Sequence, residues 1–220
     1  MDSLRDVLAR LEKEGAALGH FNVANLALLK SVVTAAAEVK VPVLIGASEG
    51  ERGFLGTREL AVLVRSLRKQ SCMDIFLNAD HTHSLPSAVE AAKVGFDAVA
   101  IDFSALPFEQ NAARTHETVE AIKAINPAIF AEGEIGDIGT GSEVHAAADE
   151  SSALSTPEQA RQFVQATGID ALAPAVGKPA RHVRKYGARK DEEASQHPEN
   201  CRDQGSSRHF SHPAWRIGHR

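Results

Sequence analysis

Residues 74–104, DIFLNADHTHSLPSAVEAAKVGFDAVAIDFS, place two short apolar runs on either side of a helical pattern. The runs DIFLNAD and AVAIDFS are typical of strands, and residues 85–94 between them have the pattern of a helix. Two strands joined in this way are parallel, because a parallel pair needs a crossover connection and the crossover is usually a helix. This stretch predicts one strand-helix-strand unit of an α/β fold.

The same rhythm continues on both sides of this stretch. Further strands are predicted at GHFNV, PVLIGAS, AIFAEGEIG and DALAPAV, and further helices over residues 26–39, 57–69, 109–125 and 157–167. Such repeats require a parallel sheet, and near-continuous apolar strands such as PVLIGA are typical of sheets covered on both faces. The architectures to weigh are a (β/α)₈ TIM barrel and an open doubly wound sheet. No G-x-G-x-x-G follows the first predicted strand, which weakens a dinucleotide-binding sheet.

The composition indicates a single globular domain. The chain has 220 residues, 43% of them hydrophobic, which is enough for one sizeable core. No apolar run approaches the roughly 18 to 20 residues of a membrane span, and MDSLRDVLARLEKEG is a charged amphipathic helix rather than a signal sequence. We therefore expect a cytoplasmic protein without a membrane partner. Cys72 and Cys201 match no metal or redox spacing, so we expect free thiols.

Polar and ionisable residues gather where the predicted strands end. In chain order these residues are Asn22, Ser48, Glu49, Asp80, His81, His83, Asp102, Ser104, Glu132 and Glu134. In a barrel of parallel strands those ends converge on one face, where the active site lies. Five strands that all contribute polar groups therefore favour a barrel with one common site.

The motif NADHTHS, residues 78–84, sets a carboxylate beside an imidazole, with a second imidazole two residues on. Extended residues at i and i+2 share a face, so His81 and His83 can point at one metal while Asp80, on the other side, moves a proton. The alternative is a polar loop that caps the helix beginning near Ser84. Metal sites need three or four ligands, so this motif by itself leaves both interpretations open.

Glu132 and Glu134 in AEGEIGDIG, on the fifth predicted strand, are either metal-site carboxylates or ordinary surface residues. In the second interpretation, both carboxylates lie in water on the exposed side of a surface strand. An otherwise apolar strand has little room for two ionised carboxylates unless a cation or a polar cavity receives them, and Asp102 in AVAIDFS poses the same question. We expect His20 and His116 to be ordinary packed or surface histidines rather than ligands.

Together, GHFNVANL, PVLIGASEG, LNADHTHS, AVAIDFSALPFEQN and EGEIGDIGTG resemble the motifs of the class II zinc-dependent ketose-bisphosphate aldolases in order and spacing. The resemblance covers residues 1–177, which we interpret as a TIM-barrel aldolase domain, incomplete at about six strand-helix units. It implies reversible aldol cleavage of a ketose bisphosphate to dihydroxyacetone phosphate and an aldehyde, with Zn²⁺ as a Lewis acid. It also implies a small sugar-phosphate substrate and a homo-oligomer.

The resemblance assigns roles residue by residue. His81 matches the first zinc ligand, and Asp80 matches the acid/base that exchanges a proton with the aldehyde-side hydroxyl. Asp102 and Glu134 match carboxylates of an alternative, more exposed zinc position. Substrate-contacting positions are matched by Asn22 and Ser48, and further candidates for the site are His83, Glu132 and Glu143.

Residues 178–220 differ sharply from the rest of the chain. They hold 10 of the 24 Lys and Arg but 5 of the 29 Asp and Glu, so this segment is +5 and residues 1–177 are −10. The family motifs A-x-G-x-x-H-G and H-G-G-S-G, which carry the second and third zinc histidines, are missing, and we expect an impaired or inactive aldolase. Our first interpretation is a frameshift: a one-base insertion after the Gly177 codon would account for both losses, because this segment permits codons that spell G-N-Q-H-G and H-G-G-S-G in a shifted frame.

Two rival interpretations of this segment are a disordered basic tail without function and an arm that binds nucleic acid or an acidic partner. The arm has no nucleic-acid motif to support it, so we expect no nucleic-acid partner. For the whole chain, the alternatives to an aldolase are a non-catalytic barrel relic that acts as a binding module and a metal-dependent hydrolase built on the same face.

Overall fold

The computed structural model describes residues 2–136 and 154–176. Within them, six strands form one parallel sheet in which each strand pairs with the next strand along the chain. The strands are β1 (Gly19–Asn22), β2 (Val43–Ala47), β3 (Ile75–Thr82), β4 (Ala98–Ile101), β5 (Phe130–Ile135) and β6 (Ala171–Pro174). A doubly wound sheet reverses its strand order at a switch point, and this described sheet does not, which removes that alternative.

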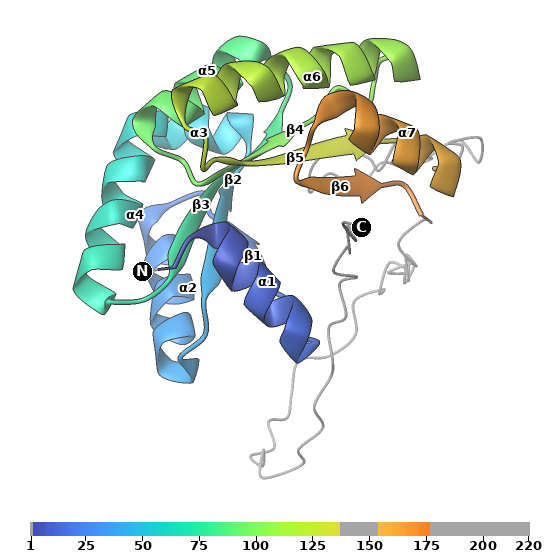
Figure 1. The fold of residues 1–220 in the computed structure, drawn as a ribbon. Helices are drawn as coiled ribbons and strands as arrows, with labels where there is room; N and C mark the ends of the chain where they lie inside the picture. The colour runs from blue at the N-terminus through green and yellow to red at the C-terminus, as the bar shows by residue number, and fades with distance from the viewer. Residues whose placement is uncertain (1, 137–153, 177–220) are drawn as a thin grey trace, which may run out of the picture.

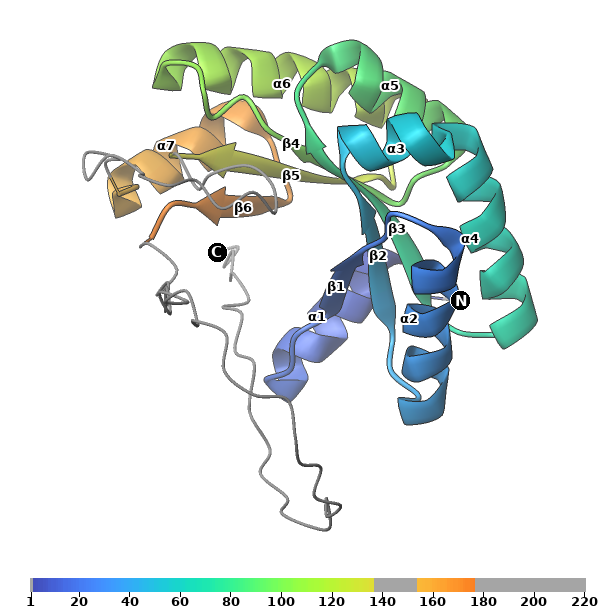
Figure 2. The same cartoon turned by 180° about the vertical axis from the view of Figure 1, so that it is seen from behind.

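The sheet curves, and most of the helices cover its convex face (Figure 1, Figure 2). These outer helices are α2 (Leu26–Val39), α4 (Thr57–Ser71), α5 (Leu85–Val94), α6 (Phe108–Ile125) and α7 (Pro157–Thr167). Parallel strands in sequential order with helices outside are the repeating unit of a TIM barrel. The described residues therefore form an open, six-stranded part of such a barrel, as the sequence predicted.

The main hydrophobic core lies between the sheet and the outer helices. Ile45, Leu77 and Val99 are at most 1% exposed on the outward side of their strands and pack in one cluster with helix residues such as Leu60 and Ile122. Burial of one such side chain stabilises a fold by about 1.5–3 kcal/mol. This layer holds the strands in fixed register and so fixes where their polar ends lie.

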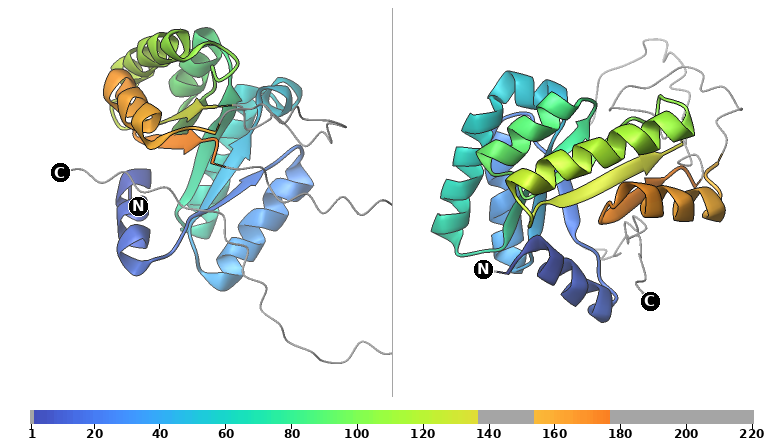
Figure 3. Two further views of the ribbon diagram at one scale, coloured as in Figure 1. Left: turned by 90° about the vertical axis from the view of Figure 1, so that its right-hand side faces the viewer. Right: turned by 45° about the horizontal axis from the view of Figure 1, so that its top comes forward.

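Helix α1 (Leu4–Glu14) lies apart from the outer helices (Figure 3). Its Val7 packs in a second, smaller core with Phe76 and Ala98, which belong to the opposite side of the sheet from the main core. Arg5 donates two hydrogen bonds, of 2.6 and 2.7 Å, to the carboxylate of Asp170 just before β6. Helix α1 thus covers the amino ends of the strands, and the carboxyl ends form the free face.

The structure adds α3 (Glu49–Leu55), a seven-residue helix between β2 and α4 that the sequence did not predict. The other helices match the predicted ranges closely, and α2, α5 and α7 begin and end at the predicted residues. Across the two described ranges, no helix combines the length and the apolar character needed to span a membrane.

Candidate metal centre

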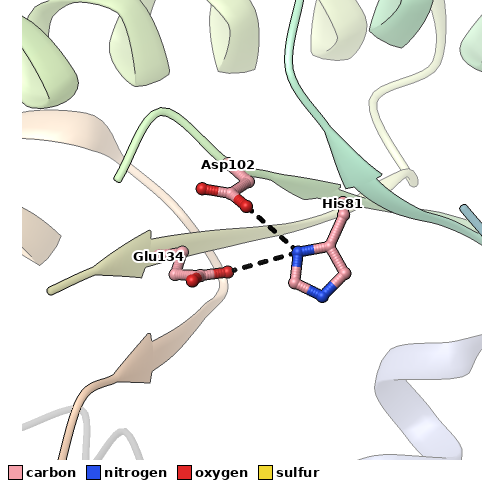
Figure 4. Close-up of side chains that lie close together, drawn as sticks. All are labelled: His81, Asp102 and Glu134. Atoms are coloured by element: carbon pink, nitrogen blue, oxygen red, sulfur yellow. Dashed lines mark hydrogen bonds and ion pairs between the residues drawn. The ribbon is translucent and has the colours of Figure 1, made fainter. Parts of the chain in front are cut away.

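Three consecutive strands bring an imidazole and two carboxylates together at the carboxyl face. His81 lies near the end of β3, Asp102 follows β4, and Glu134 lies on β5 (Figure 4). The His81 Nδ1 atom is 3.0 Å from Asp102 Oδ2 and 3.6 Å from Glu134 Oε2. One candidate ligand atom from each of the three residues lies within 4.8 Å of the others. We call these residues the metal cluster.

His81 reaches the metal cluster because β3 departs from regular strand geometry. The pairing of β3 with β4 shifts register between Ala79 and Thr82, and His81 has a φ of 40°, in the left-handed region. Strict alternation puts His81 and Asp80 on opposite sides of β3, as the sequence predicted. The left-handed turn instead swings the imidazole to the side on which Asp80 also lies, so the expected separation of these two groups was wrong.

Asp102 is 4% exposed and is oriented by its neighbours. Ser104 donates its backbone N–H, at 3.0 Å, and its hydroxyl, at 2.6 Å, to Asp102 Oδ1, while Oδ2 faces His81. Burial opposes ionisation of Asp102, but the hydrogen bonds from His81 and Ser104 outweigh it and lower its pKa to about 2. The same bond to Asp102 is the main reason that the pKa of His81 rises to about 9.

Glu134 and Glu132 add two further carboxylates from β5. Burial, with the charge of Asp102, raises the pKa of Glu134 to about 8. Burial, with the charge of Asp80, raises the pKa of Glu132 to about 7. The carboxylates at this end of the sheet therefore cannot all be ionised at neutral pH unless a bound cation offsets their burial and mutual repulsion.

The donor atoms of the metal cluster fit zinc. An imidazole nitrogen and two carboxylate oxygens are ligands that Zn²⁺ accepts. Two ligands about 2.1 Å from a tetrahedral zinc ion are about 3.4 Å apart. The distances from His81 Nδ1 to the two carboxylates, 3.0 and 3.6 Å, lie on either side of that value. A bound cation would also offset the crowding of carboxylates that raises the pKa of Glu134.

Asp80 lies beside the metal cluster and is held by Asn22. The Asn22 Nδ2 atom donates to Asp80 Oδ2 at 2.7 Å, from β1 to β3 across β2. Gly46 of β2 leaves room for this contact, because an added Cβ would lie 2.1 Å from Asn22 Oδ1 and 2.3 Å from His20 Nε2. The same His20 Nε2 atom is 3.5 Å from Asn78 Nδ2. A glycine at this position lets the polar side chains of β1 reach those of β3.

Ser48 and His83, two further candidate site residues, lie outside the metal cluster. The Ser48 hydroxyl caps α3: it accepts from the Glu51 backbone N–H and donates to the Glu51 carboxylate. His83 stands outside the metal cluster, yet its Nδ1 atom is 3.1 Å from the Asp102 carbonyl oxygen and its ring stacks on His81 with centroids 6.3 Å apart. Outside the described residues lie Glu143 and the segment 178–220 with its predicted frameshift.

Two residues that no sequence motif singled out hold the backbone around the metal cluster in place. Asn111 of α6, 2% exposed, donates from Nδ2 to the Glu134 carbonyl oxygen at 2.8 Å and accepts from the Thr115 hydroxyl. Arg52 of α3, 3% exposed, donates to oxygen atoms on both sides of His81. Polar residues four apart on the covered face of a helix are the pattern that could have revealed Asn111.

The chain is similar to proteins of one family. The family described as class II fructose-bisphosphate aldolase matches residues 2–189. The fructose-bisphosphate aldolase of Thermus caldophilus is 37% identical over 173 residues, which are 78% of this chain and 55% of that protein. The chain thus spans about half the length of this curated relative.

Solved structures agree on the fold. The YdjI aldolase from Escherichia coli K12 is 28% identical, with a TM-score of 0.68, and the match covers 80% of this chain and 62% of that one. The fructose-bisphosphate aldolase from Campylobacter jejuni is 22% identical, with a TM-score of 0.65, over 78% of this chain and 56% of that one. At 22% identity, the second likeness supports the fold alone.

Proposed function

The chain belongs to the class II fructose-bisphosphate aldolase family, whose members are carbon-carbon lyases, and we propose that its carboxyl face serves reversible aldol cleavage. The proposed substrate is a ketose bisphosphate, which divides into dihydroxyacetone phosphate and an aldehyde. The convergence of His81, Asp102 and Glu134 beside Asp80 carries this proposal. A metal site next to a proton-transferring carboxylate is what cleavage beside a ketone requires.

We propose that the metal cluster holds zinc. When bound, zinc would supply a Lewis acid that polarises the substrate ketone and stabilises the negative charge formed on cleavage. The chain fixes the ligands: Ser104 orients Asp102, and Asn111 holds the backbone of Glu134. Metal ligands bind in their deprotonated forms, so the raised pKa values of His81 and Glu134 predict weaker zinc binding as the pH falls.

Asp80 is the residue that we assign to proton transfer. In the cleavage direction, its carboxylate removes the proton from the hydroxyl on the aldehyde side of the bond that breaks. That oxygen becomes the aldehyde oxygen, and the electron pair of the broken bond stays with the dihydroxyacetone phosphate half. In the condensation direction Asp80 returns the proton. Asn22 holds the carboxylate in place through its 2.7 Å hydrogen bond.

We propose that turnover by this chain is low. The metal cluster offers one imidazole and two carboxylates, and the two motifs expected to supply more histidines are missing from the sequence. Fewer nitrogen ligands mean weaker zinc binding. A homo-oligomer and a cytoplasmic location stay predictions, which sedimentation of the purified chain and fractionation of cells would test.

Zinc loading of the full 220-residue chain tests the proposal. Fructose and tagatose bisphosphates are supplied, and triose phosphate release is followed with and without a chelator. A more sensitive readout is deuterium exchange from solvent into dihydroxyacetone phosphate, in which a carbon-bound proton next to its ketone is removed and replaced; this step needs the bound metal but no aldehyde and no proton transfer by Asp80. We expect slow cleavage and exchange, both lost on chelation.

Two variants sharpen this test. Asp80→Asn is expected to abolish cleavage while zinc still binds, and Glu117→Gln, at an exposed position of α6, is expected to behave as the parent. Release of inorganic phosphate without triose phosphate would indicate a hydrolase instead. Failure to bind zinc at all would contradict the proposed centre, and saturable sugar-phosphate binding without exchange would indicate a binding module.

A further inference from the structure

Arg52 is a buried cation behind the carboxyl face. It lies on α3 and is 3% exposed. Its Nη1 atom donates to the carbonyl oxygens of Ala47, at 2.5 Å, and Asp80, at 3.1 Å. Its Nη2 atom donates to the hydroxyls of Thr82, at 3.1 Å, and Ser87, at 3.2 Å. One guanidinium thus joins the end of β2, the end of β3 and the first turn of α5.

These bonds bracket His81. Asp80 and Thr82 are the residues directly before and after it, and Arg52 binds an oxygen of each. His81 itself has a φ of 40°, a conformation that costs a residue other than glycine about 1–2 kcal/mol. Such a backbone persists only where its surroundings over-determine it. Arg52 supplies that constraint on both sides of the turn.

The charge of Arg52 does not explain its burial. Within the described ranges it makes no ion pair with a carboxylate, and all four of its acceptors are neutral oxygens. Burial lowers the pKa of Arg52, and the charges of Glu49 and Asp80 oppose that effect only from a distance. An apolar side chain of similar size commonly fills such a space at lower cost. A planar fork that binds several oxygens at once is what arginine adds.

We propose that Arg52 is a positioning residue, which holds the left-handed turn at His81 and thereby sets how the imidazole faces Asp102 and Glu134. Arg52 does not touch a substrate or a metal in this assignment. The inference rests on the proposed function in one respect, namely that the metal cluster binds a divalent cation. The ring geometry of His81 in the metal-free protein is a separate consequence, which can be measured without any metal.

Arg68 offers a matched control at the other end of the same strand. Its Nε atom donates to the Ile75 carbonyl oxygen at 2.6 Å, and its guanidinium pairs with Asp97. Arg68 therefore ties the start of β3 to its neighbours as Arg52 ties the end. If Arg52 merely stabilises β3, Arg52→Met and Arg68→Met will change the same properties.

The test compares Arg52→Met with Arg68→Met in the full chain, with Co²⁺ as the probe. Arg52→Met is expected to weaken Co²⁺ binding by about 10- to 100-fold, the range found for residues that orient metal ligands, and to alter the visible spectrum of the bound ion. In the metal-free parent, the 3.0 Å contact of His81 Nδ1 with Asp102 predicts an Nδ1 proton that exchanges slowly enough to be seen by NMR, and Arg52→Met should remove that signal. Arg68→Met should lower the midpoint of thermal unfolding and leave both readouts unchanged.

Two further variants keep the proposal testable if Arg52→Met does not fold. Arg52→Lys retains the charge but cannot bind Asp80 and Thr82 as a fork, so it should shift both readouts in the same direction. Thr82→Val removes one acceptor of Arg52, together with the 3.0 Å hydrogen bond that the Thr82 hydroxyl donates to the Ala79 carbonyl oxygen, with little change in shape, and it should shift both readouts in the same direction. Parent-like Co²⁺ binding together with a parent-like Nδ1 proton in these variants would overturn the proposal. If the parent binds no Co²⁺, the metal centre is wrong, and the His81 proton alone decides the role of Arg52.

Discussion

Replacing Glu134 with glutamine is expected to stabilise the metal-free protein while weakening its metal binding. Glu134 is 7% exposed, and burial with the charge of Asp102 raises its pKa from an ordinary 4.5 to about 8. The unfolded chain therefore releases this proton near pH 4.5, whereas the folded protein keeps it until about pH 8. Between these values the folded state binds more protons, so the free energy of unfolding falls as the pH rises.

The size of the effect follows from the two pKa values. One proton of difference changes the free energy of unfolding by about 1.4 kcal/mol per pH unit, so a rise from pH 4.5 to 7 removes about 3 kcal/mol. His81 acts in the same direction at higher pH: its contribution is complete below pH 6.5 and is lost as the pH rises through about 9. Glutamine cannot ionise, so Glu134→Gln should be about 3 kcal/mol more stable than the parent at pH 7.

Urea unfolding in the presence of a chelator, at several values between pH 5 and 8.5, measures this difference. The parent should lose stability across the range and Glu134→Gln should lose less, whereas Co²⁺ titration without chelator should show weaker binding to the variant. Glu117→Gln, on the exposed face of α6, should stay within about 0.5 kcal/mol of the parent at every pH. Equal stability of the parent across this range, or a lower stability of Glu134→Gln than of the parent at pH 8, would contradict the raised pKa of Glu134.

Two further predictions concern the carboxyl face, and a third concerns the gene. Asp102→Asn removes a carboxylate whose pKa is lowered from 3.8 to about 2. The ionised carboxylate stabilises the folded protein above pH 3.8, and this stabilisation is lost as the pH falls through 2. At pH 5, urea unfolding should therefore show that Asp102→Asn is about 2 kcal/mol less stable than the parent. Gly46→Ala places a methyl group 2.1 Å from Asn22 Oδ1 and should displace Asn22 from Asp80. Cleavage of the ketose bisphosphate should then fall about tenfold or more with less than about 1 kcal/mol of change in unfolding free energy, and unchanged cleavage would contradict this. Sequencing the gene across codons 176–184 should reveal one superfluous base, and confirmation of the present frame would end the frameshift interpretation.

Helices could be predicted from the sequence where their boundaries depend on local contacts. Helix α2 begins at the predicted residue because Asn25 accepts the backbone N–H of Leu28, and α7 because Thr156 and Gln159 form a reciprocal cap. Helix α3 was missed because seven residues with glycines at positions 50 and 53 are too few to show a helical period.

Part of the metal cluster could be predicted because topology alone determines it. Strands β4 and β5 are neighbours in a parallel sheet, and their register pairs Ile101 with Gly133. The next residue on each strand is Asp102 and Glu134, so these two carboxylates must lie side by side at the carboxyl face. The rule that strand ends converge in a barrel therefore needed no knowledge of side-chain conformation.

The orientation of the His81 side chain could not be predicted from topology. Alternation along a strand is the guide that sequence offers for its faces, and it assigns His81 and Asp80 to opposite sides. The left-handed backbone at His81 overrides that assignment, and the oxygens that Arg52 binds around it come from two strands and a helix. No fixed spacing in the sequence records such a set of partners. An Asp-His motif thus identifies a candidate ligand, whereas the direction of its imidazole depends on hydrogen bonds from a residue elsewhere in the chain, here Arg52. A relative that keeps the motif without an arginine at this position needs another donor to the residues flanking its histidine, or it will bind the metal more weakly.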